Sequence, residues 1–332
     1  MNQRRKCLQV GTAAILCALL VRLLAMGNFL KMPLTTETLA AAIVFLETGR
    51  VVQPAGETAK TQPAETVPTQ PGMPKPEQAL PVAFYPGDSE LVELRNYSGY
   101  DVALPTFLQQ PLSWDLTAEE PTVLIIHTHA TESYVNQEGY AESSPYRTLD
   151  TQYNMLSVGD QVAALLEQGG ISVLHDRTLH DYPSYNGAYS QSRNSLSQYL
   201  EAYPSIRLVL DLHRDSVTDS AGQQLGYTLE TPRGTAAQLM LVVGSDSGGL
   251  SHPDWRDNLS LAVKLQAQLE KVCPGLCRPI SLRESRFNQD LYGEMLLVEV
   301  GAAGNSRQEA LLAAEYLAQA VLSLAQGSQF QG

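Results

Sequence analysis

Beyond its first fifty residues, the sequence has no stretch rich in lysine and arginine. The 332 residues include 22 Lys and Arg against 35 Asp and Glu, a net charge of −13. The first fifty residues hold six of the basic and two of the acidic side chains, which leaves 16 basic against 33 acidic in the remainder. Because binding of nucleic acid requires a basic surface, this balance argues against a nucleic-acid partner. It also disfavours strong binding of the acidic body to anionic lipid head groups.

Signatures of covalent catalysis and of nucleotide binding are missing as well. The sequence has no serine nucleophile elbow and no glycine-rich loop of the kind that cradles phosphate. None of its four cysteines has the setting of a reactive thiolate beside a histidine. Cys273 and Cys277 are close in sequence, which is compatible with a local disulfide or with two free thiols.

The N-terminus has the pattern of an export signal. Three basic residues at positions 4–6 precede an apolar stretch over residues 7–26 that only Arg22 interrupts, and no clear Ala-x-Ala cleavage site follows. The stretch reaches membrane-spanning length if Arg22 extends its charge to the interface. We expect an uncleaved signal-anchor over residues 1–30 rather than a cleaved signal peptide. In either case the basic end stays in the cytoplasm and the bulk of the chain is exported.

A change in composition separates this anchor from the rest of the chain. Residues 35–50 are compatible with a short amphipathic helix, whereas residues 51–81 are dominated by Pro, Thr, Glu, Gln and Ala and contain seven prolines. Such a segment cannot bury enough apolar surface to offset its ordering entropy and is typical of an extended spacer. We therefore expect a juxtamembrane segment and linker over residues 31–81, one globular domain over 82–327 and a tail over 328–332.

Within the globular part, apolar strands alternate with amphipathic helices. The patterns predict strands at 123–126, 171–174, 206–212 and 295–300, and helices at 154–168, 190–201, 254–272 and 306–325. Residues 226–230 and 238–243 are predicted to pair with each other through a turn at 231–234. Strands separated by helices of this length predict an α/β fold with a mostly parallel central sheet and helices on both faces.

Groups that can bind a metal follow two of these strands. His127, His129 and Glu132 come directly after the strand at 123–126, and His213 follows the strand at 206–212. The carboxyl ends of parallel strands share one rim of the sheet, so these side chains could meet. Two imidazoles and one carboxylate form a zinc site with an open position. The last strand contains Glu299, an ionisable group that is costly to bury without a purpose and that suits a general base.

Structural roles compete with these assignments. A single buried histidine is more often a hydrogen-bonded core residue than a ligand, but a His-x-His at one strand end and a third histidine at another favour a metal. Asp211 would either orient a ligand histidine or be purely structural. Arg214 would bind a substrate carboxylate through its planar guanidinium or pair with Asp215. The remaining histidines lack such partners and are expected at structural or surface positions: His175, His180 and His252.

A series of motifs resembles, in the same order, those of the sporulation stage II protein P family. The first is Ile-Ile-His-Thr-His-Ala-Thr-Glu-Ser-Tyr at residues 125–134, and the second is Tyr-Asn-Gly-Ala-Tyr-Ser-Gln-Ser-Arg at residues 185–193. The others lie at residues 211–216, 255–262, 287–291 and 297–310. The resemblance covers roughly residues 122–325, and an anchor with a proline-rich spacer is also expected of the family.

The resemblance implies an amidase-like, zinc-dependent cell-wall hydrolase of the N-acetylmuramoyl-L-alanine amidase superfamily. Such enzymes cut the amide between muramic acid and the stem peptide of peptidoglycan, and family members also cut peptide cross-links. The implied partners are a lytic transglycosylase, stage II protein D, and a membrane scaffold, stage II protein M. The implied place is the cell membrane, with the catalytic domain in the septal space, where the wall is thinned for engulfment of the forespore.

The resemblance also implies roles for individual residues. His127 or His129, together with Glu132 and His213, would be the zinc ligands, and Glu299 would be the general base. Both His127 and His129 stay candidates, because alternate residues of an extended strand point the same way. The wider superfamily places its glutamate ligand further from the first histidine. Two glutamates of the following loop are therefore alternatives to Glu132, namely Glu138 and Glu142.

Arg193 and Arg214 are the residues expected to hold carboxylates of the substrate. Two other functions compete with amidase activity. The chain could be a peptidoglycan-binding or scaffold module that keeps the motifs without catalysis, or a metal-dependent hydrolase of another substrate. The full set of candidate ligands argues against the first of these, and only the reaction products distinguish the second.

Overall fold

The structure is a computed structural model that describes residues 84–112, 114–135 and 146–328. All of these belong to one of the two units into which the chain divides, Pro76–Gly332. The predicted anchor and linker lie outside the described residues, as does most of the predicted tail. In the described part, no helix is both long enough and apolar enough to cross a membrane.

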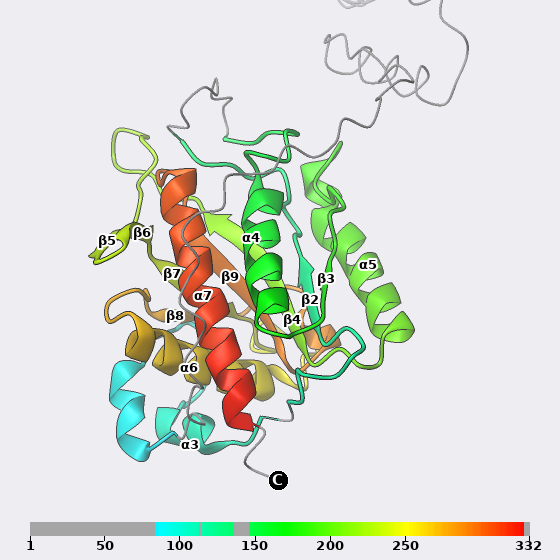
Figure 1. Cartoon of the computed structure of the whole chain (residues 1–332), viewed down its shortest axis with the longest axis vertical. Helices are drawn as coiled ribbons and strands as arrows, with labels where there is room; N and C mark the ends of the chain where they lie inside the picture. The colour runs from blue at the N-terminus through cyan, green and yellow to red at the C-terminus, as the bar shows by residue number, and fades with distance from the viewer. Residues whose placement is uncertain (1–83, 113, 136–145, 329–332) are drawn as a thin grey trace, which may run out of the picture. The chain divides into compact units, whose positions relative to one another are not determined.

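A seven-stranded sheet forms the centre of this unit. Its strands are β1 (Leu94–Asn96), β2 (Val123–Ile126), β3 (Val173–His175), β4 (Leu208–Asp215), β7 (Leu239–Val243), β8 (Ile280–Leu282) and β9 (Met295–Ala302). Their order across the sheet is β1-β8-β7-β9-β4-β2-β3 (Figure 1). Neighbouring strands are parallel except β7 and β9, which are antiparallel. The prediction of a mostly parallel sheet in an α/β fold is confirmed.

Three long helices close one face of the sheet: α4 (Met155–Gln168), α6 (Trp255–Val272) and α7 (Arg307–Ser328). Figure 1 shows α4 and α7 side by side in front of the strands, and both α4 and α6 contact α7. Alternate residues of each strand point to opposite faces. Ile125 and Leu210 accordingly join the large hydrophobic cluster that contains Val158 of α4 and Leu317 of α7. This cluster is the main core.

The other face is covered over only part of its width. Helix α5 (Ala188–Ala202) packs Leu196 against Leu124, Ile126 and Val209 in a second, smaller cluster. No helix of the described residues covers the same face further along the sheet, where side chains of β4, β7 and β9 line a pocket. Helices thus lie on both faces, as predicted, and the incomplete cover leaves room for a site.

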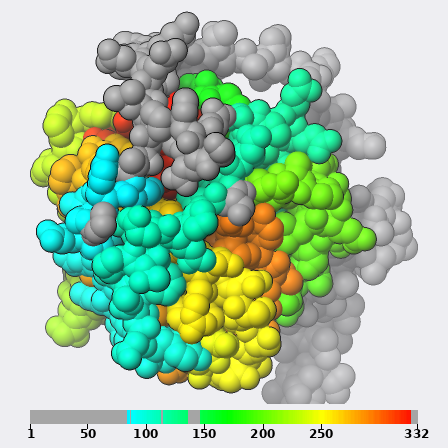
Figure 2. Space-filling view, turned by 90° about the horizontal axis from the view of Figure 1, so that it is seen from below, coloured from blue at the N-terminus to red at the C-terminus, as the bar shows by residue number. Residues whose placement is uncertain are grey.

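The smaller elements surround this framework. They are the 3-10 helices η2 (Pro86–Leu91), η3 (Tyr185–Gly187) and η4 (Gln289–Leu291), the short helix α3 (Leu104–Gln109) and the hairpin strands β5 (Thr228–Thr231) and β6 (Gly234–Ala237). Helix α3 contacts both η2 and α6. Figure 2 shows the cyan segment that contains η2 and α3 beside the yellow surface of α6. The N-terminal described segment therefore packs onto the closed side of the sheet.

The four predicted helices and the four predicted single strands are present, with ends that differ by no more than three residues. The predicted pairing of residues 226–230 with 238–243 is wrong. Strand β5 pairs instead with β6, because Gly234, at φ +120, lets the chain return directly after the two-residue turn. Strand β7, which is largely buried, therefore pairs with β8 and β9 in the main sheet rather than with β5. Cys273 and Cys277 are both free thiols.

Candidate metal centre

A turn directly after β2 places two of the candidate ligands. The strand ends at Ile126, and the chain turns over residues 128–131, where the backbone N–H of Glu132 donates to the carbonyl of His129 at 3.1 Å. The turn brings Nδ1 of His129 to 3.6 Å from Oε1 of Glu132. Both side chains are buried. Four consecutive residues thus supply an imidazole and a carboxylate on one side of the turn.

The third candidate ligand, His213, belongs to β4. Nδ1 of His213 lies 3.6 Å from Oε2 of Glu132, and the rings of His213 and His129 have centroids 5.1 Å apart. One ligand atom from each of the three residues lies within 4.8 Å of the other two. Zinc binds nitrogen and oxygen at about 2.0–2.2 Å, so tetrahedral ligands stand about 3.4 Å from one another. The donor types and their spacing therefore fit one zinc ion.

His127 does not belong to this group. It continues the alternation of β2 and points to the closed face, where Nδ1 lies 2.9 Å from the carbonyl of Leu212 and Nε2 lies 2.9 Å from Nε2 of His175. A Cβ on Gly159 of α4 would come within 2.5 Å of both imidazole Nε2 atoms, so this close packing requires glycine. The expectation that both His127 and His129 could face the site assumed a strand that continues past Ile126. The turn separates the two rings.

Asp211 holds His213 in position. One oxygen of its buried carboxylate lies 3.0 Å from Nε2 of His213, and the carboxylate also accepts hydrogen bonds from the N–H and the hydroxyl of Thr128, at 2.8 and 2.7 Å. Nδ1 of His213 is thereby directed towards Glu132. Burial lowers the pKa of His213, but the charge of Asp211 more than offsets this and raises it well above 6.5. Binding of a metal at this imidazole therefore displaces a proton.

Glu132 is ionised despite its burial. Desolvation would raise the pKa of its carboxyl, but the charge of Arg214 and then the contact with His213 lower it to about 2. Arg147 also pairs with Glu132, at 3.1 Å, and Arg214 approaches it to 3.5 Å. The cluster thus offers a fixed anionic ligand at every physiological pH.

Glu299 lies beside the cluster on β9. It is the direct partner of His213 in the β4–β9 register. Its Oε2 atom is buried and has no hydrogen-bond partner among the described residues, and burial raises the pKa of the carboxyl to about 8. Buried polar groups are nearly always satisfied, so an unsatisfied carboxyl oxygen that lines a pocket points to a partner outside the described residues.

The two arginines expected to bind substrate are engaged within the protein. Arg193 makes a two-pronged pair with Asp290, at 2.9 and 2.8 Å. Arg214 is buried and donates from its guanidinium to the carbonyls of Ser133 and Tyr146, at 3.0 and 2.9 Å. Arg214 lines the pocket, whereas Arg193 is not among its lining residues. Asp215, the alternative partner of Arg214, pairs with Arg278 instead, at 2.8 Å.

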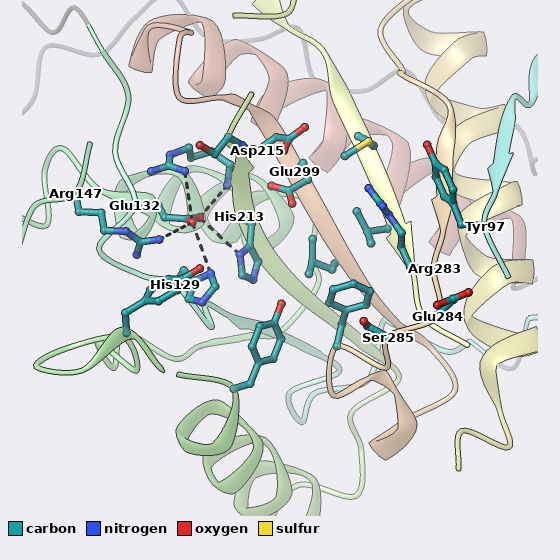
Figure 3. A pocket seen from close by; sticks show the side chains of 18 residues that line it. Tyr97, His129, Glu132, Arg147, His213, Asp215, Arg283, Glu284, Ser285 and Glu299 are labelled. Atoms are coloured by element: carbon teal, nitrogen blue, oxygen red, sulfur yellow. Dashed lines mark hydrogen bonds and ion pairs between the residues drawn. The ribbon is translucent and has the colours of Figure 1, made fainter. Parts of the chain in front are cut away.

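The cluster opens into a cavity of about 1110 Å³ (Figure 3). Tyr185 and Arg147 are lining residues that sequence reasoning did not single out. The ring of Tyr185 stacks on that of His129 with centroids 4.5 Å apart, and the guanidinium of Arg147 lies 4.4 Å from the Tyr185 ring centroid. The motif at residues 185–193 was the available signal for Tyr185. The alternative ligands Glu138 and Glu142 lie outside the described residues.

Comparison with known families identifies one match over most of the chain. The model of the family described as stage II sporulation protein P matches residues 47–322. The chain is also 29% identical over 207 residues to the stage II sporulation protein P of Bacillus subtilis strain 168. That alignment covers 58% of this chain and 48% of the relative, so the chain spans about half the length of the curated relative that it matches.

Comparison with solved structures finds weaker, partial likeness. One match is the N-acetylmuramyl-L-alanine amidase Ami1 of Mycobacterium smegmatis, with a TM-score of 0.40 and 12% identity, covering 63% of this chain and 98% of that one. Another is an N-acetylmuramoyl-L-alanine amidase of Clostridium difficile 630, with a TM-score of 0.38 and 16% identity, covering 65% of this chain and all of that one.

Proposed function

Since this chain belongs to the stage II sporulation protein P family, we propose that it is a zinc-dependent peptidoglycan hydrolase. The bond cut is the amide between N-acetylmuramic acid and the L-alanine of the stem peptide, and the same chemistry would serve peptide cross-links. One observation carries the proposal. The buried group His129, Glu132 and His213 adjoins the unsatisfied carboxyl of Glu299 in a large pocket. Family membership confirms the resemblance seen in the sequence.

His129, Glu132 and His213 would hold the zinc ion. Zinc in such a three-ligand site polarises a carbonyl and makes water a better nucleophile. The protein's part is to fix the ligands. Asp211 orients the imidazole of His213. The stacked ring of Tyr185 restrains that of His129.

Glu299 would act as the general base. In its ionised form, Oε2 accepts a proton from the attacking water and then passes it to the nitrogen of the leaving L-alanine. A carboxylate with a raised pKa is a stronger base than an ordinary one, and burial raises the pKa of Glu299 to about 8. Its position opposite His213 in the sheet supports this role, because the base must lie next to the metal ligands.

The size of the pocket supports an extended substrate. Sites for small molecules usually have volumes of about 300–1,000 Å³. A cavity of about 1110 Å³ extends from His129 past Glu299 to Arg283 and Tyr97. It is large enough for a sugar on one side of the scissile amide and several amino acids on the other.

We also propose the setting in which the enzyme works. The anchor predicted over residues 1–30 would hold the domain at the outer side of the membrane, in the septal space. Stage II protein D, as a lytic transglycosylase, and stage II protein M, as a scaffold, would be its partners in forespore engulfment. Family membership and the N-terminal sequence pattern support these proposals.

The test is hydrolysis by the purified full-length chain in detergent. Incubation with peptidoglycan should release stem peptides with a free N-terminal L-alanine, as detected by mass spectrometry. A chelator should abolish the release and added zinc should restore it. Activity that survives both the chelator and Glu299→Gln would sink the mechanism. Binding to peptidoglycan without release of fragments would favour the scaffold alternative.

A further inference from the structure

The end of the pocket away from the metal ligands is built by a segment that follows β8. Arg283, Glu284 and Ser285 come directly after Leu282 and line the pocket together with Tyr97, which follows β1. Figure 3 shows these side chains on one side of the pocket and His129 and Arg147 on the other, with Glu299 between them. A group bound at Arg283 would therefore contact a part of the substrate distant from the reacting amide.

The backbone of this segment is firmly held. The N–H of Arg283 donates to the carbonyl of Val243 at 2.8 Å, and its own carbonyl accepts from the hydroxyl of Ser245 at 2.7 Å. The N–H of Tyr97 donates to the carbonyl of Leu282 at 2.9 Å. Both side chains thus start from fixed points at the edge of the sheet. Pre-organisation of this kind lowers the entropy lost when a ligand binds.

Arg283 differs from the other arginines of the pocket in having no acidic partner among the described residues. Arg147 and Arg214 both pair with Glu132. The guanidinium of Arg283 instead lies 4.6 Å from the ring centroid of Tyr97, and no described carboxylate comes within ion-pair distance of it. The neighbouring Glu284 is likewise exposed and unpaired with Arg283. The guanidinium is exposed, and its edge can donate to a ligand.

We propose that Arg283, supported by the ring of Tyr97, binds a carboxylate of the stem peptide and so sets a preference for acidic over amidated peptides. The inference rests on the proposed function, which puts the stem peptide in this pocket. A planar guanidinium binds a carboxylate through two parallel hydrogen bonds and cannot bind a primary amide in the same way. Stacking on an aromatic face leaves that edge of the guanidinium free. Arg283 is therefore a specificity residue that acts on substrate binding.

The test compares two synthetic muropeptides that differ only in one acidic residue of the stem, which carries a free carboxylate or a primary amide. Initial rates are measured with the full-length chain. The wild type should have the lower KM for the free acid. Arg283→Gln should raise that KM about tenfold, with kcat little changed, because a charge-assisted pair is lost. The KM for the amide should stay the same.

Arg95→Gln is the matched control. Arg95 is an exposed arginine of β1, two residues before Tyr97, and it does not line the pocket. The same change of charge on the same edge of the sheet should leave both KM values unchanged. Equal effects of Arg283→Gln on the two muropeptides, or no effect on either, would overturn the inference.

A binding measurement distinguishes failure of this inference from failure of the proposed function. Calorimetric titration of the free acid and the amide uses the Glu299→Gln variant, with and without Arg283→Gln. If the wild type hydrolyses neither muropeptide, the proposed function fails. If Arg283→Gln weakens binding of the free-acid muropeptide about tenfold and leaves binding of the amide unchanged, the carboxylate site is still supported. Unchanged binding would overturn it whether or not hydrolysis occurs.

Discussion

The two faces of the central sheet are built from the same strands but differ in the partners and pKa values of their polar side chains. On the closed face, under α4 and α7, His127 has both ring nitrogens in contact with protein atoms, and burial lowers its pKa to about 3. On the open face, His213 sits beside Asp211 with its pKa raised well above 6.5. Glu299 on the same face has an oxygen without a partner among the described residues.

This difference shows how one sheet serves stability and chemistry at the same time. Strand alternation sends residues of β4 and β9 to both sides, and on the side that three helices cover both strands contribute apolar residues to the main core, such as Leu210 and Val298. On the open side, polar side chains of β4 and β9, such as those of His213 and Glu299, line the pocket. The four predictions below test whether the faces are as separate as the geometry indicates.

The largest effect should come from the two histidines that flank Thr128. We expect His129→Ala to lower zinc affinity by more than about 100-fold and to abolish hydrolysis, because it removes a proposed direct ligand. His127→Gln should keep zinc and activity and should lower the free energy of unfolding by about 1–3 kcal/mol. Zinc content and competition with a chelator measure the zinc binding of both variants, and release of stem peptides measures their activity. Denaturant unfolding measures the stability of the His127→Gln variant. Loss of zinc from the His127→Gln variant would show that the closed face also contributes to metal binding.

Next in size is the effect of Glu299→Gln on turnover. Loss of a general base usually lowers kcat by about 10²–10⁴-fold. Since Glu299 is not among the three proposed ligands, zinc should stay bound with unchanged stoichiometry. Steady-state kinetics and metal analysis of the same sample give both quantities. A variant that loses its zinc, or that turns over normally, would remove Glu299 from the proposed role.

The same substitution should change how stability depends on pH in the metal-free protein. The pKa of Glu299 is about 8 in the folded chain against 4.5 ordinarily. The neutral carboxyl therefore favours the folded state fully below pH 4.5, and this contribution is lost as the pH rises through 8. Glu299→Gln should match wild-type stability near pH 4 and exceed it above pH 8 by about 2–4 kcal/mol. Equal stabilities at pH 9 would mean that the carboxyl is better solvated than its position implies.

The smallest expected effect belongs to the closed face. Gly159→Ala places a methyl group 2.5 Å from Nε2 of His127 and of His175, which should lower the free energy of unfolding by about 1–3 kcal/mol. Zinc affinity and kcat should not change. Gly87→Ala is a suitable control, since no atom of the described residues lies within 4 Å of a Cβ at that position. Chemical denaturation and steady-state kinetics of both variants test the contrast.

The sequence predicted the long elements well and the contacts between distant residues poorly. Apolar periodicity located the main helices and strands, because burial of one face imposes it. Strands β1 and β8, of three residues each, were not predicted, although β3 is equally short and was. The choice between His127 and His129 depended on where β2 ends, and Ile126 looks no more terminal in sequence than its neighbours.

The charged residues show the same limit. Arg193 pairs with Asp290, which is 97 residues away in the sequence, and Arg283 contacts Tyr97 across a still longer stretch of sequence. No local pattern encodes such pairs, so the sequence could nominate arginines as substrate ligands but could not show which ones were already engaged. His213 and Glu299, which a strand end and a costly buried charge singled out in the sequence, both line the pocket, and their predicted roles as ligand and base stay predictions.

Strand β9 has a consequence for the order of folding. It is the last strand in the sequence, yet it lies in the middle of the sheet, between β4 and β7. Without β9, the sheet would be divided into two groups of strands, β4-β2-β3 and β7-β8-β1. The first contains His129, Glu132 and His213, the second leads to Arg283, and Glu299 arrives with the strand that joins them. Non-local pairing of this kind is slow. The pocket is complete only when β9 is in place, so a partly synthesised chain that lacks β9 has no assembled site.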